Sequence, residues 1–582
     1  MFRSAWIAVL LVFIGSADAS QQPKYLYDAA SATWASILAM VEPATGLPRD
    51  TLNRVYLDLY PQLAPLRWCP NVSTATGASL VVTPCALPEC RHRGSYGARF
   101  DYAMPSMGTY GSYELTPGGQ FDVSAAEFIE LSGKGALGNE RFEIVLWSDC
   151  SGSFPGRPVS GAITLSTDWQ RFRIPLRDYM SSNVRIDSLC RVVIGFNDAL
   201  HRGGTIYLDD IVFVRADGSR IHIAHDEETS TSNIGLYLPS VVAAKDLGLI
   251  SETEMLARLG QALASIEALS KTHGFPQTHN HIVSLRPDAA QSCIAFVDTG
   301  NLAVGLVVVR NAVPQVASRA SALLEAMDWE WAFDPAVGLP HGCRFADQPP
   351  TGHYDFYAAD SHGGQATAIG SGKMPASSWD HLMRPVEAAR CASKPHFGPG
   401  WLGGGLFMQA LPALVLDTSR TPLGSSLIAF IEDQICYAKN AGAVAWGFSA
   451  TVPPQGCTYC GYGCPLNFIA PHASMLVAGF VFDDVLRANL EALDAAGARP
   501  SVNDGVNTYD FGYVSSISLD GTVQSPVFLV FDQEMAFLGA ANRLTGGGVR
   551  RYFCQDALAD GIRRFIPEYA NACRPRGRSV RH

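Results

Sequence analysis

The chain has 582 residues, a formal net charge of −11 and 47% hydrophobic residues. The acidic balance argues against a nucleic-acid-binding surface, and the hydrophobic content argues against a disordered chain. The length also exceeds that of a single ordinary core, since one domain takes about 100–200 residues. We therefore expect a multidomain protein with sizeable cores and no nucleic-acid partner.

The first residues have the layout of a secretory signal peptide. Basic Arg3 precedes an apolar run at 5–14 and the small-x-small sequence Ala17-Asp18-Ala19, which predicts cleavage after Ala19. The run is too short for a transmembrane helix, and no later stretch offers about 18 uninterrupted apolar residues. The sequence thus predicts a periplasmic or secreted protein with no membrane span after cleavage of residues 1–19.

Residues 29–41 have apolar side chains on one helical stripe and are followed by Pro43-Ala44-Thr45-Gly46, a helix stop signal. From about 95 to 215 the chain changes to short segments rich in β-branched and aromatic residues, separated by Gly, Ser, Asp and Pro. These predicted strands are 142–147, 162–166, 169–176, 191–196 and 205–214. Several short strands at this spacing predict a β-sandwich.

After residue 230 the pattern is helical again. The predicted helices are 235–247, 252–271, 302–313, 317–331, 404–416, 425–441, 472–495 and 533–544. The long segments 334–378 and 446–471 are rich in Gly, Pro and aromatic residues, which is typical of functional loops. The pattern indicates a sandwich inserted after the first helix of a helical domain.

The 14 cysteines form an even number, which predicts disulfides in an exported chain. Cys150/Cys190 and Cys554/Cys573 are candidates for local pairs. The densest group is CTYCGYGC at 457–464, where at least one cysteine needs a partner elsewhere because three cannot pair among themselves. A zinc site would need a second cysteine knuckle, and a thioredoxin-like site would need a βαβ context. We therefore predict a disulfide-stapled loop, with no metal and no cofactor.

Several segments resemble known families of exported bacterial proteins. TWASILAMVEPATGLPRDTL, TSTSNIGLYLPSVVAAKDLGLIS and FVDTGNLAVGLVVVRNA are similar to the domain of unknown function 3131, of the glucoamylase-like (α/α)6-barrel group. MDWEWAFDP, AIGSGKMPASSW, GLFMQALPALVLD, WGFSA, IAPHAS and FDQEMAFLGAANRLTGGGVRRYF occur in the order found in glycoside hydrolase family 144, the endo-β-1,2-glucanases. WQRFRIPLRDY and TIYLDDIVF resemble the galactose-binding-like jelly roll of carbohydrate-binding modules.

Pattern and resemblance together imply a multidomain α and β protein, in which an (α/α)6 toroid barrel holds an inserted β-sandwich of the jelly-roll type. The expected parts are a signal peptide at 1–19, the first barrel helix at 20–60, a carbohydrate-binding-like sandwich at 61–219, the glycoside-hydrolase-like barrel at 220–553 and a C-terminal tail at 554–582. We expect the basic end of that tail to be solvated.

The resemblance implies a glycoside hydrolase or transglycosylase that acts on a glucan-type polysaccharide or oligosaccharide, with β-1,2-glucan as the family-implied substrate. Hydrolysis needs one protonated carboxyl group that donates to the leaving oxygen and a second carboxylate that activates water or attacks directly. The family has an acidic residue upstream of an Ile-Gly-Ser turn, and FYAADSHGGQATAIGS has Asp360 at that spacing. Asp360 is thus the predicted general acid.

Asp298, at the start of an apolar helix, and Asp532, within FDQE, are the candidate bases, and Asp328 is a further candidate. Each has a structural alternative, as a helix cap or as a buried hydrogen-bonded carboxylate. Aromatic residues in or beside the long loops are predicted to stack on sugar rings, with core packing as the alternative for about half of them. The predicted substrate contacts are Trp329, Trp331, Tyr354, Tyr357, Trp401, Trp446, Tyr459 and Tyr462, together with Gln409.

The sequence departs from the family at two points. A carboxylate-bearing Asp-Gly-Thr segment is replaced by Leu466-Asn467-Phe468, and Met408-Gln409 stands where relatives tend to have His-Gln. Without that carboxylate, another group serves as base, the mechanism is retaining or transglycosylating, or the protein binds polysaccharide without cleaving it. A non-catalytic envelope polysaccharide-binding protein and an export or assembly protein therefore stay open as alternatives.

Overall fold

The structure is a computed structural model that describes residues 23–60, 62, 71–116, 120–148, 161–180, 184–221, 223, 226–288, 293–456, 458–504 and 506–573. The signal peptide predicted at 1–19 lies outside these residues. Within the described ranges, no helix is both long and apolar enough to cross a membrane.

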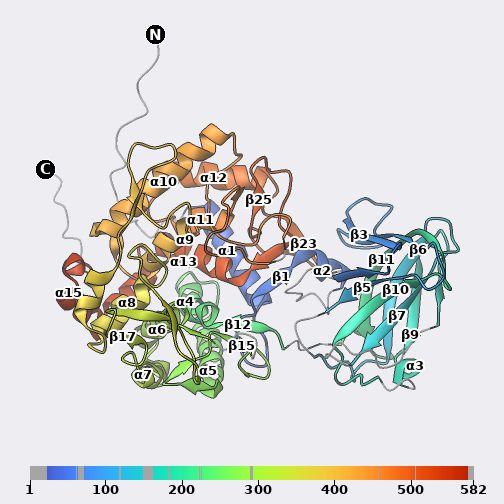
Figure 1. Cartoon of the computed structure of the whole chain (residues 1–582), viewed down its shortest axis with the longest axis horizontal. Helices are drawn as coiled ribbons and strands as arrows, with labels where there is room; N and C mark the ends of the chain where they lie inside the picture. Colours follow the sequence, from blue (N-terminus) through green and yellow to red (C-terminus); the bar gives the residue numbers. More distant parts are fainter. Residues whose placement is uncertain are drawn as a thin grey trace, which may run out of the picture.

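The described chain forms two lobes (Figure 1), a helical lobe built from both ends of the chain and a β lobe built from its middle. Each lobe has its own cluster of buried hydrophobic side chains. The cluster of the helical lobe takes residues from 26–52 and 234–573, and the cluster of the β lobe takes residues from 55–223. The protein is therefore a mixed helix-and-sheet structure with two cores.

The β lobe consists of two five-stranded antiparallel sheets, with strand orders β2-β5-β10-β7-β8 and β3-β4-β11-β6-β9. Their bounds are β2 Asn71–Thr74, β3 Ser79–Cys85, β4 Gly97–Ala103, β5 Tyr110–Leu115, β6 Phe128–Gly135, β7 Arg141–Trp147, β8 Ile163–Thr164, β9 Gln170–Pro175, β10 Arg191–Asn197 and β11 Gly203–Val214. Strand β7 alternates buried and half-buried residues, as expected where one face meets a core. The five predicted strands are all present, whereas β2 and β3, which are largely exposed, have no apolar pattern to reveal them.

The helices are α1 Lys24–Ala39, α2 Arg54–Leu59, α3 Arg177–Met180, α4 Thr231–Asp246, α5 Glu252–Ala268, α6 Phe296–Ala312, α7 Ala317–Ala326, α8 His362–Gly370, α9 Leu406–Ala410, α10 Pro422–Ala441, α11 Pro471–Leu476, α12 Asp483–Ala495, α13 Val530–Leu544, α14 Gly548–Cys554 and α15 Ala557–Phe565, with 3₁₀ helices η2 Pro314–Val316, η3 Ala376–His381, η4 Leu411–Leu414, η5 Thr418–Arg420 and η6 Pro567–Tyr569. Of these, α2 and α3 belong to the part of the chain around the β lobe, and the rest form the helical lobe.

Short strands connect the helices. They are β1 Thr51–Asn53, β12 Glu228–Ser230, β13 Lys271–Thr272, β14 Phe275–Pro276, β15 His279–His281, β16 Ile294–Ala295, β17 Phe333–Asp334, β18 Leu339–Arg344, β19 Thr351–His353, β20 Val386–Glu387, β21 His396–Phe397, β22 Phe468–Ile469, β23 Ser501–Asn503, β24 Thr508–Asp510, β25 Ile517–Ser518 and β26 Val527–Leu529. Strand β1, near the N-terminus, pairs with β26, near the C-terminus, with Thr51 opposite Leu529. This pairing holds the two ends of the helical lobe together across the inserted β lobe.

Two predicted helices are interrupted. The segment 472–495 forms two helices, α11 and α12, separated by turns that contain Gly479. The segment 404–416 is the short helix α9 followed by η4, where Pro412 lacks the N–H that an α-helix needs. Glycine and proline thus divided segments that hydrophobicity alone predicted as continuous.

The boundary expected at residue 553 is wrong. Helix α15 contacts α8, and Ile562, Ile566 and Tyr569 belong to the core of the helical lobe. The Glu568 carboxylate accepts hydrogen bonds from the Tyr357 hydroxyl and from a Trp379 ring nitrogen. Residues 554–573 therefore complete the helical lobe, and the basic segment 574–582 lies outside the described residues.

Five cysteine pairs are found within the described ranges. They are Cys85–Cys90, Cys293–Cys343, Cys391–Cys436, Cys460–Cys464 and Cys554–Cys573. The predicted pairing of Cys554 with Cys573 is confirmed, whereas Cys150 and Cys457 lie outside the described residues. The loop that holds CTYCGYGC is closed by Cys460–Cys464.

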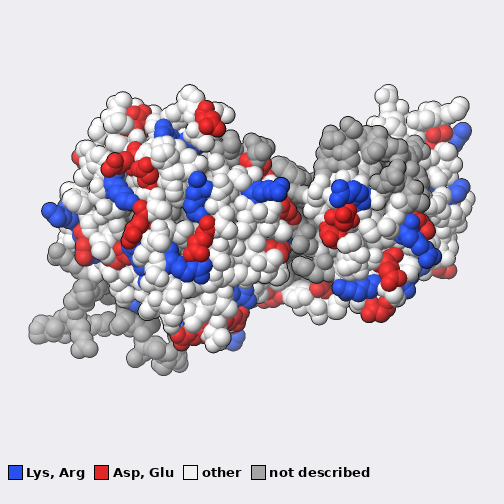
Figure 2. Space-filling model, turned by 90° about the horizontal axis from the view of Figure 1, so that it is seen from below, with Lys and Arg blue, Asp and Glu red and all other residues white. Residues whose placement is uncertain are grey.

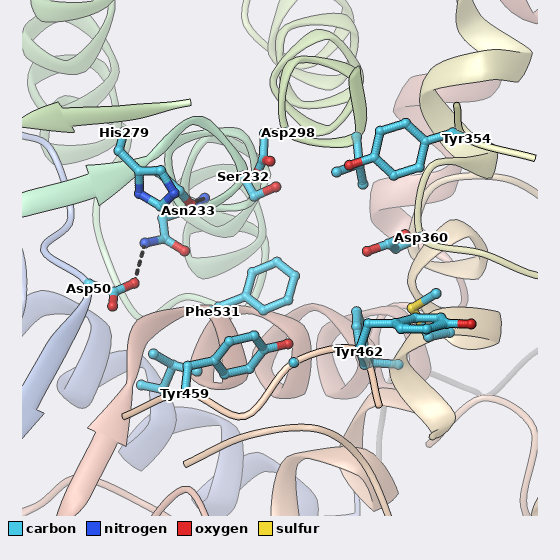
Figure 3. Close-up of a pocket in the computed structure, with 16 residues that line it drawn as sticks. Asp50, Ser232, Asn233, His279, Asp298, Tyr354, Asp360, Tyr459, Tyr462 and Phe531 are labelled. Atoms are coloured by element: carbon cyan, nitrogen blue, oxygen red, sulfur yellow. Dashed lines mark hydrogen bonds between the residues drawn. The ribbon is translucent and has the colours of Figure 1, made fainter. Parts of the chain in front are cut away.

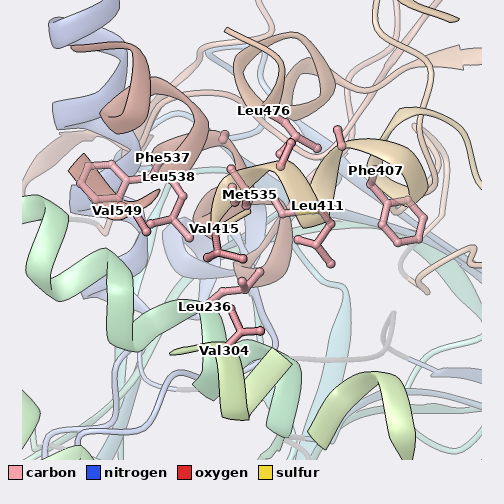
Figure 4. Close-up of a cluster of buried hydrophobic side chains, with 14 of the residues drawn as sticks. Leu236, Val304, Phe407, Leu411, Val415, Leu476, Met535, Phe537, Leu538 and Val549 are labelled. Carbon is pink, nitrogen blue, oxygen red and sulfur yellow. The ribbon is translucent and has the colours of Figure 1, made fainter. Parts of the chain in front are cut away.

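Helices α4, α6 and α8 pack closely because glycines meet where they cross. A Cβ atom added at Gly305 of α6 would lie 2.1 Å from the backbone oxygen of Gly235 of α4, and one at Gly300 would lie 2.8 Å from the Cα of Gly364 of α8. On the other side, Leu236 and Val304 meet apolar side chains from α13 and from the α9–η4 segment (Figure 4). The spacing of these three helices is thus set by backbone contact.

We expect the substitution Gly305→Ala to lower the free energy of unfolding by about 1–3 kcal/mol, because the added methyl group has to push two backbones apart. Urea denaturation measures the change. Gly260→Ala is the matched control, since nothing lies within 4 Å of a Cβ atom at this position of α5, and alanine there should stabilise the protein by about 0.5–1 kcal/mol. Equal effects of the two substitutions would contradict the packing argument.

Candidate active site

A cavity of about 480 Å³ opens in the helical lobe. Its walls come from segments far apart in the sequence: the chain before β1, the β12–α4 junction, β15, the start of α6, the loop before α8, α9, the loop at 458–464 and the β26–α13 junction. The lining residues are Asp50, Ser230, Ser232, Asn233, His279, Val297, Asp298, Tyr354, Asp360, Phe407, Met408, Tyr459, Gly461, Tyr462, Leu529 and Phe531.

Three carboxylates line this cavity (Figure 3), namely Asp50, Asp298 and Asp360. Asp298 lies in the first turn of α6, and Asp360 directly precedes the N-cap residue of α8. The backbone of Asp50 is held on both sides, because its N–H donates to Glu228 at 3.2 Å and its carbonyl accepts from the N–H of Val530 at 2.8 Å. Close packing of α6 on α8 therefore brings two of the three together, and the β1–β26 pairing brings the third.

The start of α4 connects these carboxylates. The side-chain amide of Asn233 donates to Asp50 at 3.1 Å, and the side-chain amide of Asn301 donates to the Ser232 hydroxyl at 2.9 Å. Hydrogen bonding with Ser232 also acts on Asp298. Neighbouring residues of one helix thus hold carboxylates on two sides of the cavity.

Burial raises the pKa of Asp360 to about 7, and the charge of nearby Asp298 adds to the rise. Burial also raises the pKa of Asp298, but hydrogen bonding from Ser232 and the nearby His279 act in the opposite direction. Two carboxyl groups that share a cavity cannot both ionise easily, and the better-solvated or better-bonded one ionises first. Asp298 therefore has side-chain partners that favour its ionised form, while the pKa of Asp360 lies near neutral pH.

Aromatic rings form much of the remaining wall. Tyr459 and Tyr462 are 40% and 66% exposed and belong to the loop that Cys460–Cys464 closes. Tyr354 faces the same cavity from the loop before α8. Of the aromatic residues that the sequence predicted as sugar contacts, these three line the cavity.

The other predicted substrate contacts do not line the cavity, and for the buried ones the prediction is wrong. The buried residues are Trp329, Tyr357, Trp401, Gln409 and Trp446. Each has a structural role of the kind expected for large buried side chains with a polar tip: for example, the indole N–H of Trp401 donates to Asp433 at 2.8 Å, and the Gln409 amide donates to the Phe397 carbonyl at 2.7 Å. Trp331 is partly buried and stacks on His273 at a ring-centroid distance of 4.7 Å.

Asp532 does not line the cavity either. Its side chain is fully buried, accepts a hydrogen bond from the Thr451 hydroxyl and lies 3.3 Å from a ring nitrogen of His472. A carboxylate enclosed in this way cannot reach a substrate, so its prediction as a base is wrong. Asp328 lies at the surface, where it pairs with His273 at 2.9 Å.

Sequence reasoning missed five polar residues of the cavity, which are Asp50, Ser230, Ser232, Asn233 and His279. Asp50 lies in the segment 33–52, and Ser232 and Asn233 lie in 229–251. Both segments resemble the glucoamylase-like group, and their polar residues next to predicted helix ends are the available signal. His279 lies in a three-residue strand, too short to be seen in the pattern.

The raised pKa of Asp360 predicts how stability depends on pH. A carboxyl group whose folded pKa of about 7 exceeds its unfolded value near 3.8 stabilises the fold below about pH 4, and that contribution is lost as pH rises through 7. The Asp360→Asn variant lacks this loss. Its free energy of unfolding should therefore rise relative to that of the parent by at most about 4 kcal/mol between pH 4 and pH 8. Urea denaturation across this range tests it.

Asp328→Asn is the control. Hydrogen bonding with His273 lowers the pKa of Asp328, so the parent loses the stability that this lowered pKa provides as pH falls. Relative to the parent, the free energy of unfolding of Asp328→Asn should therefore rise toward acidic pH, whereas that of Asp360→Asn rises toward alkaline pH. A stability difference for Asp360→Asn that stays constant with pH would contradict the raised pKa.

Solved structures with the same fold extend over most of the chain. A β-1,2-glucanase from Parabacteroides distasonis matches with a TM-score of 0.59 and 12% identity over 89% of this chain and all of its own. An endo-β-1,2-glucanase from Chitinophaga pinensis matches with a TM-score of 0.50 and 14% identity over 59% of this chain and 87% of its own. A glucoamylase-like protein from Bacteroides uniformis matches with a TM-score of 0.51 and 13% identity over 59% of this chain and 89% of its own.

Comparison of sequences alone matches a much smaller part of the chain. A cyclic β-(1,2)-glucan synthase from Rhizobium meliloti is 35% identical over 96 residues, which are 16% of this chain and 3% of the synthase. The chain thus spans only a small part of the length of that curated relative. No family model matches the chain. At sequence identities of 12–14%, the similarity to the solved structures shows the fold alone. The chain has the fold of the solved β-1,2-glucanases and glucoamylase-like proteins.

Proposed function

We propose that the protein is an exported glycoside hydrolase that cleaves a glucan, with β-1,2-glucan as the first substrate to test. The observation that carries this proposal is the pair formed by Asp298 and Asp360, two carboxyl groups that line one cavity, with the pKa of Asp360 raised to about 7 and side-chain partners that favour ionised Asp298. Glycoside hydrolysis needs such a pair. The β-1,2-glucanases with the same fold support the choice of substrate.

The proposal includes the finer architecture and the location. The helical lobe is an (α/α)6 toroid barrel and the β lobe a jelly roll inserted at about 61–219, which the glucanase and glucoamylase-like neighbours support. The cysteine pairs of the described residues are compatible with an extracellular or periplasmic protein, as is the signal-peptide layout of residues 1–19.

In the proposed mechanism, protonated Asp360 donates its proton to the glycosidic oxygen as the bond to the anomeric carbon breaks. Ionised Asp298 stabilises the positive charge that develops on the sugar and either takes a proton from the attacking water or attacks the anomeric carbon itself. Asp50, held by Asn233, accepts hydrogen bonds from sugar hydroxyls, and Tyr462 stacks on a ring. Asp298 thereby supplies the carboxylate that is missing at Leu466-Asn467-Phe468.

The surface charge favours a neutral polymer over a polyanion. On the face shown in Figure 2, basic and acidic side chains are interspersed on both lobes. The net charge is −11, which disfavours close approach of an anionic chain.

The substitutions Asp360→Asn and Asp298→Asn should each lower the release of reducing ends from β-1,2-glucan by about 10²–10⁴-fold, because each removes one of the two proton-transfer or charge-stabilising groups. Each asparagine has nearly the same shape as the aspartate that it replaces, and circular dichroism checks that both variants are folded. Asp328→Asn, at a surface aspartate paired with His273, should keep full activity.

Full activity of Asp360→Asn would remove Asp360 from the mechanism. Binding without product formation by the parent protein, measured by calorimetry against a panel of glucans, would instead favour the non-catalytic binding protein or the export and assembly protein.

A specific observation also favours glycan binding by the β lobe. A groove of about 270 Å³ lies on the sheet β2-β5-β10-β7-β8, where Tyr110 and Trp147 stand among Glu114, Glu143 and Asn197. Tyr110 is 49% exposed. Aromatic faces with a few carboxylate and amide groups suit sugar rings and their hydroxyls. We therefore propose that this groove holds a second segment of the same polysaccharide.

Trp147→Ala combined with Tyr110→Ala should weaken retention of the protein on long glucan, measured by affinity electrophoresis, by at least roughly tenfold, since each sugar ring stacked on an aromatic side chain contributes about 1 kcal/mol or more. Hydrolysis of short oligosaccharides should stay unchanged because the active-site cavity is in the other lobe. Trp169→Ala is the control, since Trp169 does not line the groove. Unaltered retention of the double variant would contradict a binding role for the groove.

A further inference from the structure

Three residues that can bind metals meet outside the cavity, on the small sheet formed by β16, β18, β17 and β19. Asp334 ends β17, His341 lies in β18 and His353 ends β19. One donor atom from each lies within 4.8 Å of the other two. The closest pair is a ring nitrogen of His353 and a carboxylate oxygen of Asp334, at 3.0 Å, and the two imidazoles stack at a centroid distance of 5.4 Å.

Strand pairing fixes this arrangement. His341 and His353 are direct partners across the antiparallel pair β18–β19, and partners of this kind project from the same face with their Cβ atoms about 4.5–5.5 Å apart. Asp334 pairs with Leu339, two residues before His341, and the N–H of His341 donates to the Ala332 carbonyl at 2.9 Å. The three donors are thus held by backbone hydrogen bonds and do not depend on loop conformation.

We propose that Asp334, His341 and His353 form a binding site for a divalent transition metal, with Zn²⁺ as the ion that suits this donor set best. Two imidazoles and one carboxylate are common ligands of zinc, and water takes the fourth tetrahedral position. Donors on a tetrahedral zinc ion lie about 3.3 Å apart, so small side-chain rotations bring the present arrangement to bonding distance.

The surroundings of the three residues fit this assignment. One carboxylate oxygen of Asp334 accepts a hydrogen bond from the N–H of Ala336 at 2.9 Å, which orients the other oxygen toward His353. Partners of this kind set the direction of metal ligands. The side chains of His353 and Asp334 are 28% and 21% exposed, so an ion reaches them from solvent.

The position of the site indicates a stabilising role for the metal. His353 directly precedes Tyr354, which lines the active-site cavity, and the N–H of Tyr354 donates to the Pro340 carbonyl of β18 at 3.1 Å. Strand β18 also pairs with β16, which leads straight into α6 and Asp298. A metal ion that links β17, β18 and β19 therefore rigidifies the sheet from which two walls of the cavity start, while its ligands stay outside the cavity.

Metal binding to the full-length protein tests the proposal. After dialysis against a chelator, titration with Zn²⁺ followed by calorimetry should show one ion bound per chain, and the midpoint of thermal unfolding should rise with Zn²⁺ concentration. His341→Ala and His353→Ala should each weaken binding by at least roughly tenfold and abolish the rise. Replacement of Zn²⁺ by Co²⁺ should give the visible absorption of a tetrahedral site in the parent only.

The matched control is His273→Ala, which removes a surface histidine paired with one aspartate at 2.9 Å in a pair that does not belong to the three-ligand group. It should bind Zn²⁺ as the parent does. Asp334→Asn keeps the shape of the third ligand and covers the case in which a histidine variant fails to fold, which thermal unfolding without metal reveals. The proposal is overturned if the parent binds no Zn²⁺, or if binding persists undiminished in folded His341→Ala, His353→Ala and Asp334→Asn.

Discussion

Two carboxyl groups that line one cavity each make ionisation of the other harder, and the site of this protein is organised around that constraint. Burial raises the pKa of both Asp298 and Asp360. Asp298 has compensating partners in Ser232 and His279, whereas Asp360 has the backbone N–H of Ser361, so the two carboxyl groups differ in what favours their ionised forms. In the proposed mechanism, a difference of a few polar contacts thus separates an acid from a base that have the same chemical structure.

The packing of the helical lobe brings these two carboxyl groups into the same cavity. Asp298 and Asp360 start α6 and precede α8, and these helices approach until glycine backbones touch at Gly300 and Gly364. Larger residues at the crossing would separate the helices, and the electrostatic influence of one carboxylate on the other falls with distance. The glycines of the core are therefore part of the chemistry of the cavity, although they do not line it.

The sequence predicts those helices, strands and cavity residues that have a local pattern. The strands from β7 to β11 and most long helices carry apolar periodicity. Asp298 and Asp360 lie in segments with a recognisable resemblance, and Tyr459 and Tyr462 lie in a long loop rich in aromatic residues; all four line the cavity. Sequence reasoning failed where burial decides the role of a residue, because Trp401 and Trp446 look like loop aromatics in the sequence and are core residues in the structure. It also failed for groups assembled by pairing, since Asp334, His341 and His353 have no motif spacing and meet only when three strands align.

The pairing of β1 with β26 has a consequence for the order of folding. The contact joins residues near 52 to residues near 528, and the C-terminal helix α15 must also dock before the core of the helical lobe is complete. Closing so large a loop carries an entropic cost that no local contact offsets in advance. The β lobe has its own core and lies wholly within that loop, so it forms first and shortens the chain that remains to be closed. A chain that emerges from the ribosome with its N-terminus first keeps its helical lobe open until the last segment is out, so the cavity of this lobe is assembled after the β lobe.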